Sequence, residues 1–233
     1  YPPEFGIFPL IMGSISITIG SLIVAIPLGL GSAIYISEIA NSRVKEILKP
    51  IIELLANIPS VVYGLVGMVF FVPLVQRIFN IPIGLNVFSA SIILGVMIIP
   101  IISSVSEDAL STVPQQLKEG SYALGANKWE TITKIIIPSA KTGIIVSIVL
   151  GFGRAIGETM VVLMIAGGSP HIPKSIFQSA RPLTSAIASE MGEAVIGSQH
   201  YHSLFGIAIV LFMIIFITNL IIEITVKKRW RIK

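Results

Sequence analysis

The first long apolar stretch of the chain indicates its fold class. It runs from Gly6 to Ser37, GIFPLIMGSISITIGSLIVAIPLGLGSAIYIS, without a single Asp, Glu, Lys or Arg. A helix needs about 20 apolar residues to cross the hydrocarbon core of a bilayer, so this stretch is long enough to span a membrane. Similar stretches follow at Leu54–Gln76, Ile78–Ser106 and Ala194–Ile222, and at Thr142–Gly168, where Arg154 and Glu158 are the charged residues. The sequence therefore predicts five membrane-spanning helices.

The composition supports an integral membrane protein. Hydrophobic residues make up 54% of the chain and charged residues only 12%, against roughly 25% charged residues in a typical soluble domain. A soluble monomer of this composition could not cover its surface with polar side chains, which excludes an ordinary cytosolic enzyme. The absence of cysteine excludes thiol catalysis, thiolate metal sites and disulfides. Because the apolar runs are continuous rather than alternating, a transmembrane barrel is not expected.

We predict an all-α integral membrane protein with five transmembrane helices, forming one domain over residues 1–233. The spans are placed at about residues 8–36, 51–76, 87–106, 141–167 and 204–226. Two connections are too long for simple turns: a cytoplasmic coupling region at 107–140 and an extracytoplasmic loop at 168–203. Proline within the spans, as at Pro27, Pro59 and Pro100, is tolerated in membrane helices and predicts kinks.

The basic residues predict the orientation in the membrane. Most of the 16 Lys and Arg residues fall in three segments: Arg43, Lys45 and Lys49; Lys118, Lys128, Lys134 and Lys141; and Lys227, Lys228, Arg229, Arg231 and Lys233. Cytoplasmic loops are enriched in Lys and Arg, so these segments and the C-terminus are expected in the cytoplasm. Tyr1 is then outside. Since the chain also lacks an initiator methionine, we expect it to be a piece from which one N-terminal helix is missing.

The coupling region has the pattern of two short amphipathic helices. Its apolar residues recur at helical spacing: Leu117, Tyr122, Ala123, Leu124, Trp129, Ile132, Ile135 and Ile136. Gly125, within Leu-Gly-Ala-Asn, is expected to separate the two helices. From the residues alone, a helix lying on the lipid headgroups is an alternative interpretation.

This region resembles the cytoplasmic signature of ABC importer permeases, which is Glu-Ala-Ala, three residues, Gly, nine residues, and Ile-x-Leu-Pro. The spacing is fitted without a gap by Glu119-Gly120-Ser121, Gly125 and Ile135-Ile136-Ile137-Pro138. Gly120, Ser121 and Ile137 depart from the signature, although the first two remain small and the third remains aliphatic. The resemblance implies a coupling helix that docks into a separate ATP-hydrolysing subunit. Its coupling residues would be Glu119, Gly120, Ser121, Gly125, Ile135 and Pro138.

Other stretches resemble the permeases of phosphate importers. Ala56–Gly64, ANIPSVVYG, and Gly153–Met160, GRAIGETM, are similar to the two marker stretches of that family. Met97–Val105 and Ile187–Ala194 are more similar to the PstC-type subunit than to its PstA-type partner. The resemblance implies a permease that moves inorganic phosphate by alternating access. Members of this family usually have six helices, so the missing helix would be the N-terminal one.

The resemblance also implies a set of partners in the inner, or cytoplasmic, membrane. They are a PstA-type second permease subunit, two ATP-binding subunits, an extracytoplasmic phosphate-binding protein and membrane lipid, with no nucleic acid. ATP and Mg would be used by the partner ATPase. The chain has no Gly-x-x-x-x-Gly-Lys-Ser/Thr loop, so we expect it to be a non-catalytic subunit that binds no cofactor and no metal itself.

Arg154 and Glu158 are the strongest candidates for the substrate path. A charge near the bilayer centre costs at least a few kcal/mol, and these two lie four residues apart on one helix face. They form either a buried pair that neutralises itself or an oxyanion site. In the second case, the arginine fork binds phosphate oxygens and Glu158 accepts the phosphate hydroxyl, which sulfate lacks at neutral pH. Asn57, Ser60 and Tyr63, beside Pro59, are further path candidates, with a kink or packing as the alternative.

Three alternative functions remain open at this point. A permease for another oxyanion, such as sulfate or molybdate, would use the same features. An ion-coupled secondary transporter or channel could use Arg154 and Glu158, and a membrane scaffold would transport nothing. The match to the coupling signature disfavours the last two, because neither needs a docking site for an ATPase.

Overall fold

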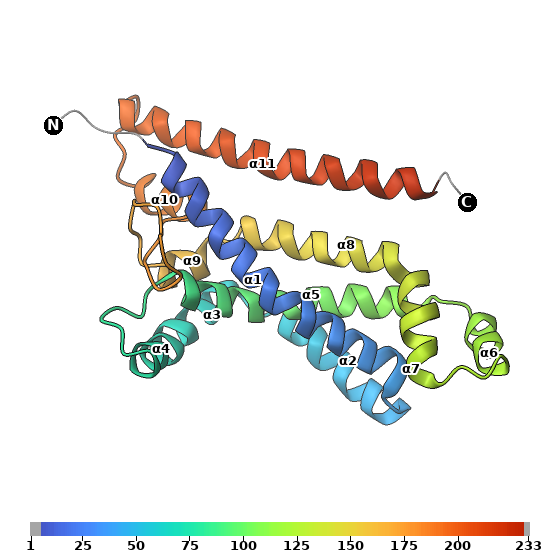
Figure 1. Cartoon of the computed structure of the whole chain (residues 1–233). Helices are drawn as coiled ribbons and strands as arrows, with labels where there is room; N and C mark the ends of the chain where they lie inside the picture. Colours follow the sequence, from blue (N-terminus) through green and yellow to red (C-terminus); the bar gives the residue numbers. More distant parts are fainter. Residues whose placement is uncertain (1–5, 231–233) are drawn as a thin grey trace. The chain divides into compact units, whose positions relative to one another are not determined.

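The computed structural model describes the backbone of residues 6–230 and the side chains of residues 6–220. This part of the chain is helical, with an isolated β-bridge between Gly167 and Ala180 (Figure 1). Five helical segments in it are long and apolar enough to cross a membrane: Phe8–Ile39, Ser60–Ile78, Val87–Ser111, Lys128–Ile156 and Gln199–Leu220. The prediction of an all-α membrane protein with five spans is confirmed. The prediction for Tyr1 and those for the side chains of the basic tail, Lys227 to Lys233, fall outside the described residues.

The helices follow one another with few long connections. Their bounds are α1 Phe8–Ile34, α2 Ser42–Ala56, α3 Ser60–Val66, α4 Val72–Ile78, α5 Val87–Ser111, α6 Gln115–Ala123, α7 Lys128–Thr131, α8 Ile137–Ile156, α9 Met160–Ile165, α10 Leu183–Glu190 and α11 Gln199–Trp230. Three π-helical turns continue α1, α3 and α7: η1 Tyr35–Ile39, η2 Gly67–Phe71 and η3 Ile132–Ile136. Such turns are typically single insertions within α-helices.

The chain divides into two compact units. The first consists of the described parts of residues 1–24, 58–97 and 152–221, and the second of those of residues 25–57, 98–151 and 222–233. In the first unit, α3 packs closely on α9. A Cβ atom built on Gly64 would lie 2.7 Å from the Met164 sulfur, so a larger residue here would displace the Met164 side chain. Close packing through small residues is the usual way in which membrane helices associate.

The second unit has an apolar core reinforced by hydroxyl groups. The buried members of that core are Ala33, Leu110, Val113, Ile132, Ile136, Ala140 and Ile144, from α1, α5, η3, α8 and the residues after α5. Ser32 donates a hydrogen bond of 2.8 Å to Ser103, which links α1 to α5. Ser106 and Ser147 share another of 2.7 Å, which links α5 to α8. These bonds satisfy the polar groups where no water is available.

The second predicted span, 51–76, needs a correction at its start. Its first residues belong to α2, which ends at Ala56, and the spanning segment begins at Ser60. Pro59 lies between the two helices, with φ −57° and ψ 136°. Proline disfavours a helical conformation of the preceding residue, here Ile58, so the helix is broken although apolar residues lie on both sides.

The fourth predicted span, 141–167, lies too far along the chain. The spanning helix begins at Lys128 and ends at Ile156, and α9 follows after a break at residues 157–159. The remaining spans keep their places but extend to Ile39, to Ser111 and back to Gln199. Within the predicted loop 168–203, Leu183–Glu190 forms helix α10. The observed spans therefore include charged or polar residues near their ends, and most span ends differ from the predicted ones.

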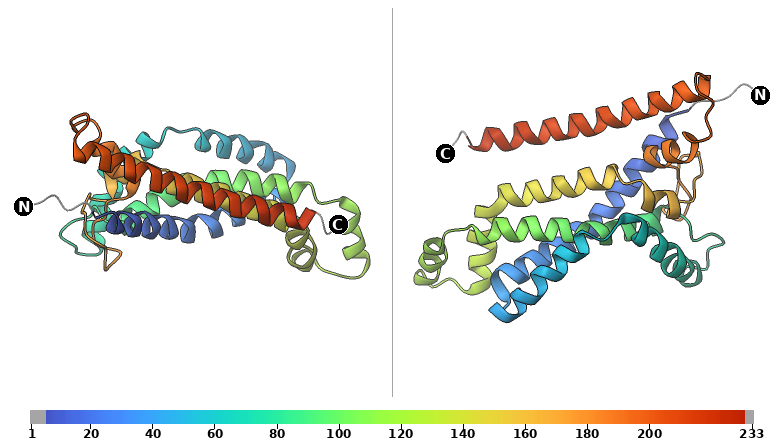
Figure 2. Two further views of the ribbon diagram at one scale, coloured as in Figure 1. Left: turned by 90° about the horizontal axis from the view of Figure 1, so that it is seen from above. Right: turned by 180° about the vertical axis from the view of Figure 1, so that it is seen from behind.

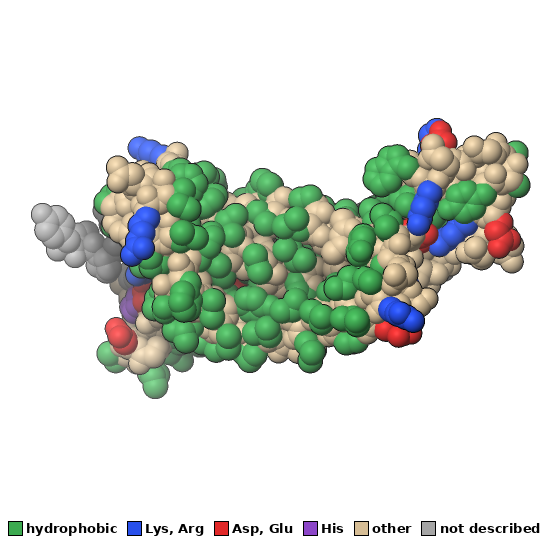
Figure 3. Space-filling model, turned by 90° about the horizontal axis from the view of Figure 1, so that it is seen from below, with side chains coloured by type: hydrophobic (Ala, Val, Ile, Leu, Met, Phe, Trp, Pro, Cys, Tyr) green, Lys and Arg blue, Asp and Glu red, His purple; other side chains and the backbone are tan. Residues whose placement is uncertain are grey.

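The surface is that of a protein made for an apolar environment. Figure 3 shows hydrophobic side chains over most of the face that it draws, with few charged ones. Helix α11, which Figure 2 shows as one uninterrupted rod, exposes large apolar side chains such as Ile209 and Phe212, each 63% exposed. In the membrane, such side chains lie against lipid or a partner helix.

Candidate functional site

The predicted break in the coupling region lies at Gly125. Helix α6 ends at Ala123, and Gly125 follows with a φ of +83°, a conformation that favours glycine. Its N–H donates to the Tyr122 carbonyl at 2.9 Å and closes the turn. Asn127 then begins α7 with a capping box, because Glu130 N–H donates to Asn127 Oδ1 at 2.9 Å and Asn127 N–H to Glu130 Oε2 at 3.1 Å. The predicted break at Gly125 and a short helix before it are confirmed, but α7 is the beginning of the spanning helix Lys128–Ile156 and not a separate short helix.

The coupling region presents a groove of about 580 Å³. Four of the six predicted coupling residues line it: Gly120, Ser121, Gly125 and Ile135. Glu119 and Pro138 are exposed but do not line it. Leu124, which also lines it, is 91% exposed, and Trp129 at the start of α7 is 64% exposed. Large apolar side chains held in the open next to a groove are typical anchors for a protein partner.

Arg154 and Glu158 lie close together, as their spacing predicts. Arg154 Nη2 is 3.9 Å from Glu158 Oε2, which is longer than a hydrogen bond. The two side chains differ in exposure, since that of Arg154 is 46% exposed and that of Glu158 only 5%. The guanidinium N–H groups of Arg154 therefore face an open side of the first unit and remain available to a further acceptor.

Glu158 has a second role that sequence reasoning missed. Its Oε1 accepts hydrogen bonds from the N–H groups of Met160 at 3.0 Å and Val161 at 3.4 Å, at the start of α9. Its carbonyl accepts a bond of 2.7 Å from Thr184 Oγ1 on α10. A carboxylate at this place satisfies helix N–H groups that have no partner within the helix. Glu158 thus holds the break between α8 and α9 as well as facing Arg154.

The other predicted path residues are divided between the units. Ser60 and Tyr63 lie on α3, which packs against α9 next to the Glu158 cap. Asn57 belongs to the second unit, where its side chain donates to the Glu53 carbonyl at 2.8 Å and closes the end of α2. Ser60 and Tyr63 therefore lie on a helix that packs against α9, the next helix after Arg154. Asn57 instead caps the end of α2.

Two acidic residues of the second unit with largely shielded side chains were not singled out from the sequence. Glu38 accepts from Lys118 Nζ at 2.8 and 3.0 Å, and Glu107 pairs with Lys49 at 2.7 Å and Lys45 at 3.1 Å. Hydrogen bonds to Glu107, and then to Asp108, raise the pKa of Lys49 above its usual value, so this amine stays charged. Each glutamate is the first charge after a long uncharged stretch, and that signal could have revealed both.

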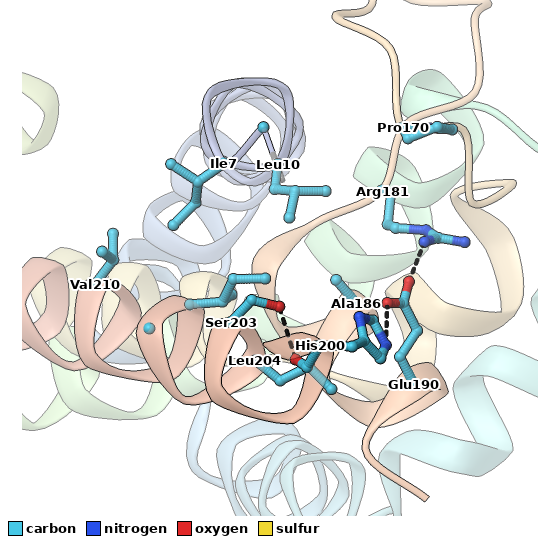
Figure 4. A pocket seen from close by; sticks show the side chains of 13 residues that line it. Ile7, Leu10, Pro170, Arg181, Ala186, Glu190, His200, Ser203, Leu204 and Val210 are labelled. Atoms are coloured by element: carbon cyan, nitrogen blue, oxygen red, sulfur yellow. Dashed lines mark hydrogen bonds and ion pairs between the residues drawn. The ribbon is translucent and has the colours of Figure 1, made fainter. Parts of the chain in front are cut away.

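A further pocket, of about 370 Å³, lies in the first unit between the start of α1, α10 and α11. Figure 4 shows Glu190 between Arg181 and His200 at its polar end. Arg181 Nη1 donates to Glu190, Arg181 Nε donates to the Gly168 carbonyl at 3.1 Å, and Glu190 Oε2 lies 3.3 Å from His200 Nε2. These contacts tie the segment before α10 to the beginning of α11.

Comparison with known proteins identifies the family. The family described as "Binding-protein-dependent transport system inner membrane component" matches residues 25–231. Probable ABC transporter permease protein YqgH of Bacillus subtilis (strain 168) is 40% identical over 227 residues, which cover 97% of this chain and 74% of that protein. Phosphate transport system permease protein PstC of Haemophilus influenzae is 36% identical over 231 residues, covering 91% and 72%.

Solved structures support the fold. The inward facing methionine ABC transporter MetNI superposes with a TM-score of 0.68 at 19% identity, over 96% of this chain and 94% of that chain. A bacterial ABC transporter involved in the import of the acidic polysaccharide alginate gives 0.70 at 16% identity, over 94% and 78%. Taken with the family match and the relatives above, this chain belongs to the binding-protein-dependent transport system inner membrane components, which are the permease subunits of ABC importers.

Proposed function

We propose that this chain is the PstC-type permease of a phosphate importer and moves inorganic phosphate across the inner membrane by alternating access. As a membrane component of an ABC transporter it is a non-catalytic transport subunit, and ATP is bound by partner ATPase subunits. A transporter of this kind also includes a binding protein and a partner permease. In our proposal these are a phosphate-binding protein, a PstA-type permease and two ATPase subunits. The support for phosphate comes from the PstC relatives, at 31–36% identity, and from Arg154.

The exposure of Arg154 is the observation that carries the proposal. Its side chain is 46% exposed in the first unit, although it lies near the end of a helix long enough to cross the membrane. A charge facing lipid costs at least a few kcal/mol, so this side of the helix should face a partner subunit or a water-filled path. A planar guanidinium with available N–H groups is well suited to two oxygens of a tetrahedral anion.

Glu158 provides the selectivity in this proposal. Its Oε1 is engaged by the start of α9, while its Oε2 faces Arg154. An anion bound by Arg154 would therefore meet a carboxylate oxygen. Phosphate at neutral pH still carries a hydroxyl that donates to this oxygen, whereas sulfate carries none and is repelled. Ser60 and Tyr63 would add hydroxyl groups from α3, on the helix packed against α9.

The coupling region is the surface on which we propose that the ATPase subunit docks. Its groove is lined by Gly120, Ser121, Gly125, Ile135 and the exposed Leu124, and Trp129 is exposed at the start of α7. Glu119 and Pro138 would meet the partner from the exposed surface. A secondary transporter or a channel has no use for such a surface, and the family assignment excludes both.

Uptake into proteoliposomes tests the substrate. The complete importer, purified with its ATPase subunits and supplied with its binding protein and ATP, is given phosphate, sulfate or molybdate. One hydrogen bond to a charged group contributes about 1.5–3 kcal/mol, so we expect phosphate uptake to exceed sulfate uptake at least about tenfold. Omission of ATP is the control and should abolish uptake. Faster uptake of sulfate or molybdate would instead assign the chain to another oxyanion.

Single-cysteine labelling tests the orientation. The chain contains no cysteine, so Ser42→Cys and Glu193→Cys each introduce a single reactive thiol at an exposed position. We expect a membrane-impermeant maleimide to label Ser42→Cys only from the cytoplasmic side and Glu193→Cys only from the outside, because basic segments stay in the cytoplasm. The unsubstituted chain is the control and should not react. The reversed pattern would place the coupling region outside and would contradict ATPase docking.

A further inference from the structure

The coupling helix α6 is held in place by very few side chains. Of its nine residues, Gln115–Ala123, only Ser121 is buried, and Leu117 and Tyr122 are 47% and 45% exposed. A helix this short is not stable on its own in water. Figure 1 shows α6 beside α7, at the edge of the second unit. Its position must therefore depend on a small number of specific contacts.

Two polar contacts on one face of α6 supply this attachment. Lys118 Nζ lies 2.8 and 3.0 Å from the two carboxylate oxygens of Glu38, and Ser121 Oγ lies 2.9 Å from Thr131 Oγ1 on α7. Lys118 and Ser121 are three residues apart and so lie on the same side of the helix. The first contact leads to the end of α1 and the second to α7.

The pair between Lys118 and Glu38 is shielded from water. The Lys118 side chain is 15% exposed and that of Glu38 is 8% exposed. Shielded pairs are screened by salt much less than exposed ones, so this contact is stronger than a typical surface ion pair. By comparison, the pair between Lys134 and Glu130 within one helix is 71% and 40% exposed. Among the ion pairs of the described side chains, the Lys118 pair is the one that attaches α6.

Glu38 is itself fixed at the end of a membrane span. It lies in the π-helical turn η1, which continues α1 to Ile39, and Ser37 Oγ donates to its Oε1 at 2.9 Å. A displacement of Lys118 is thus passed to the last turn of the first spanning segment. Leu124, directly after α6, is 91% exposed, so a partner can reach it.

We propose that the ion pair between Lys118 and Glu38 is the link through which α6 moves α1 during transport. The two are positioning residues: they touch neither ATP nor the transported anion. This inference rests on the proposed coupling role of α6 and adds the route by which its movement enters the membrane. Without the pair, ATP hydrolysis continues in the assembled importer, but fewer anions cross for each ATP hydrolysed.

The ratio of uptake to ATP hydrolysis in proteoliposomes tests the link. Coupling between sites is typically worth about 5- to 150-fold, and we expect Lys118→Met and Glu38→Gln each to lower the ratio at least about tenfold. Lys118→Arg keeps the charge and should stay near the original ratio. The exchange Lys118→Glu with Glu38→Lys should recover most of it. Lys141→Met, at an exposed lysine of α8, is the matched control and should change nothing.

A distance measurement distinguishes loss of the link to η1 from a general loosening of α6 in Lys118→Met. Spin labels at Ala123→Cys on α6 and Ile39→Cys in η1 report their separation in the complete importer, with and without ATP. With the pair intact, we expect the same narrow distance distribution in both states, because the two elements move together. In Lys118→Met, the distribution should shift or broaden when ATP binds.

The possible failures are distinguishable. If Lys118→Met kept the uptake ratio of the Lys141→Met control, or if the intact pair let the label distance change with ATP as much as Lys118→Met does, the link would be overturned while the ATPase docking stood. If ATPase subunits did not co-purify with the unsubstituted chain, the coupling role of α6 would be lost, and the link with it.

Discussion

Arg154→Leu should abolish phosphate uptake while the importer still assembles in the membrane. A bidentate pair of charge-assisted hydrogen bonds contributes about 3 kcal/mol or more, which corresponds to a loss of at least about 100-fold. Because the Arg154 side chain is 46% exposed, we expect the fold to survive its replacement. Arg154→Lys is the matched variant that keeps the charge, and it should transport poorly because a point charge does not reproduce the planar fork. Uptake is measured at matched membrane abundance.

A double variant separates the anion path from a pair that only neutralises itself. The suitable partner change is Glu158→Gln rather than leucine, since the amide oxygen can still accept from the N–H groups at the start of α9. If the two charges only neutralise each other, removing both should restore transport that Arg154→Leu had lost. On the anion-path proposal, the double variant remains inactive. Near-normal uptake by the double variant would leave only the structural role for Arg154.

Gly125→Val should remove most of the ATP hydrolysis that the binding protein stimulates. The residue has a φ of +83°, which a β-branched side chain adopts only at a cost of about 1–3 kcal/mol. No atom lies within 4 Å of a Cβ built at this position, so the effect comes from the backbone and not from a clash. We expect the turn between α6 and α7 to be distorted and the hydrolysis stimulated by the binding protein to fall at least about tenfold.

The controls for Gly125→Val are a second substitution and a binding measurement. Asparagine tolerates the left-handed conformation, so Gly125→Asn should retain most of the stimulated hydrolysis. Docking of the external binding protein should be unaffected by either change, because the turn is expected on the cytoplasmic side. Normal stimulated hydrolysis in Gly125→Val would remove the turn from the docking surface.

The spans were predictable because a membrane-crossing helix needs a long run of apolar residues, and such runs are visible in the sequence. Five uncharged or nearly uncharged stretches are visible without knowledge of any contact. Helix ends within those stretches were not, because apolar residues continue through them. Pro59 separates α2 from α3, and residues 157–159 separate α8 from α9, in stretches with apolar residues on both sides of the break. Proline alone did not decide this, since Pro27 and Pro100 lie within continuous helices.

The site was predictable where it depends on local geometry. The turn at Gly125 and the approach of Arg154 to Glu158 both follow from residues a few positions apart. The bond from Thr184 to the Glu158 carbonyl joins residues 26 positions apart, and the pair of Lys118 with Glu38 joins residues 80 positions apart. Spacing cannot reveal such partners. What the sequence does show is an acidic residue at the end of an uncharged stretch on the side rich in lysine.

The π-helical turn η3 sets the angular phase of the helix that follows the coupling region. Ile132, Ile136, Ala140 and Ile144 are all buried at intervals of four residues. In an unbroken α-helix, residues four apart drift by about 40°, so three such steps would carry this stripe out of the core. A π turn has hydrogen bonds from residue i to i+5 and winds less per residue, which offsets part of that drift. With one residue fewer in η3, α7 would be rotated by about 100° relative to Ala140 and Ile144, and the coupling surface would face another direction.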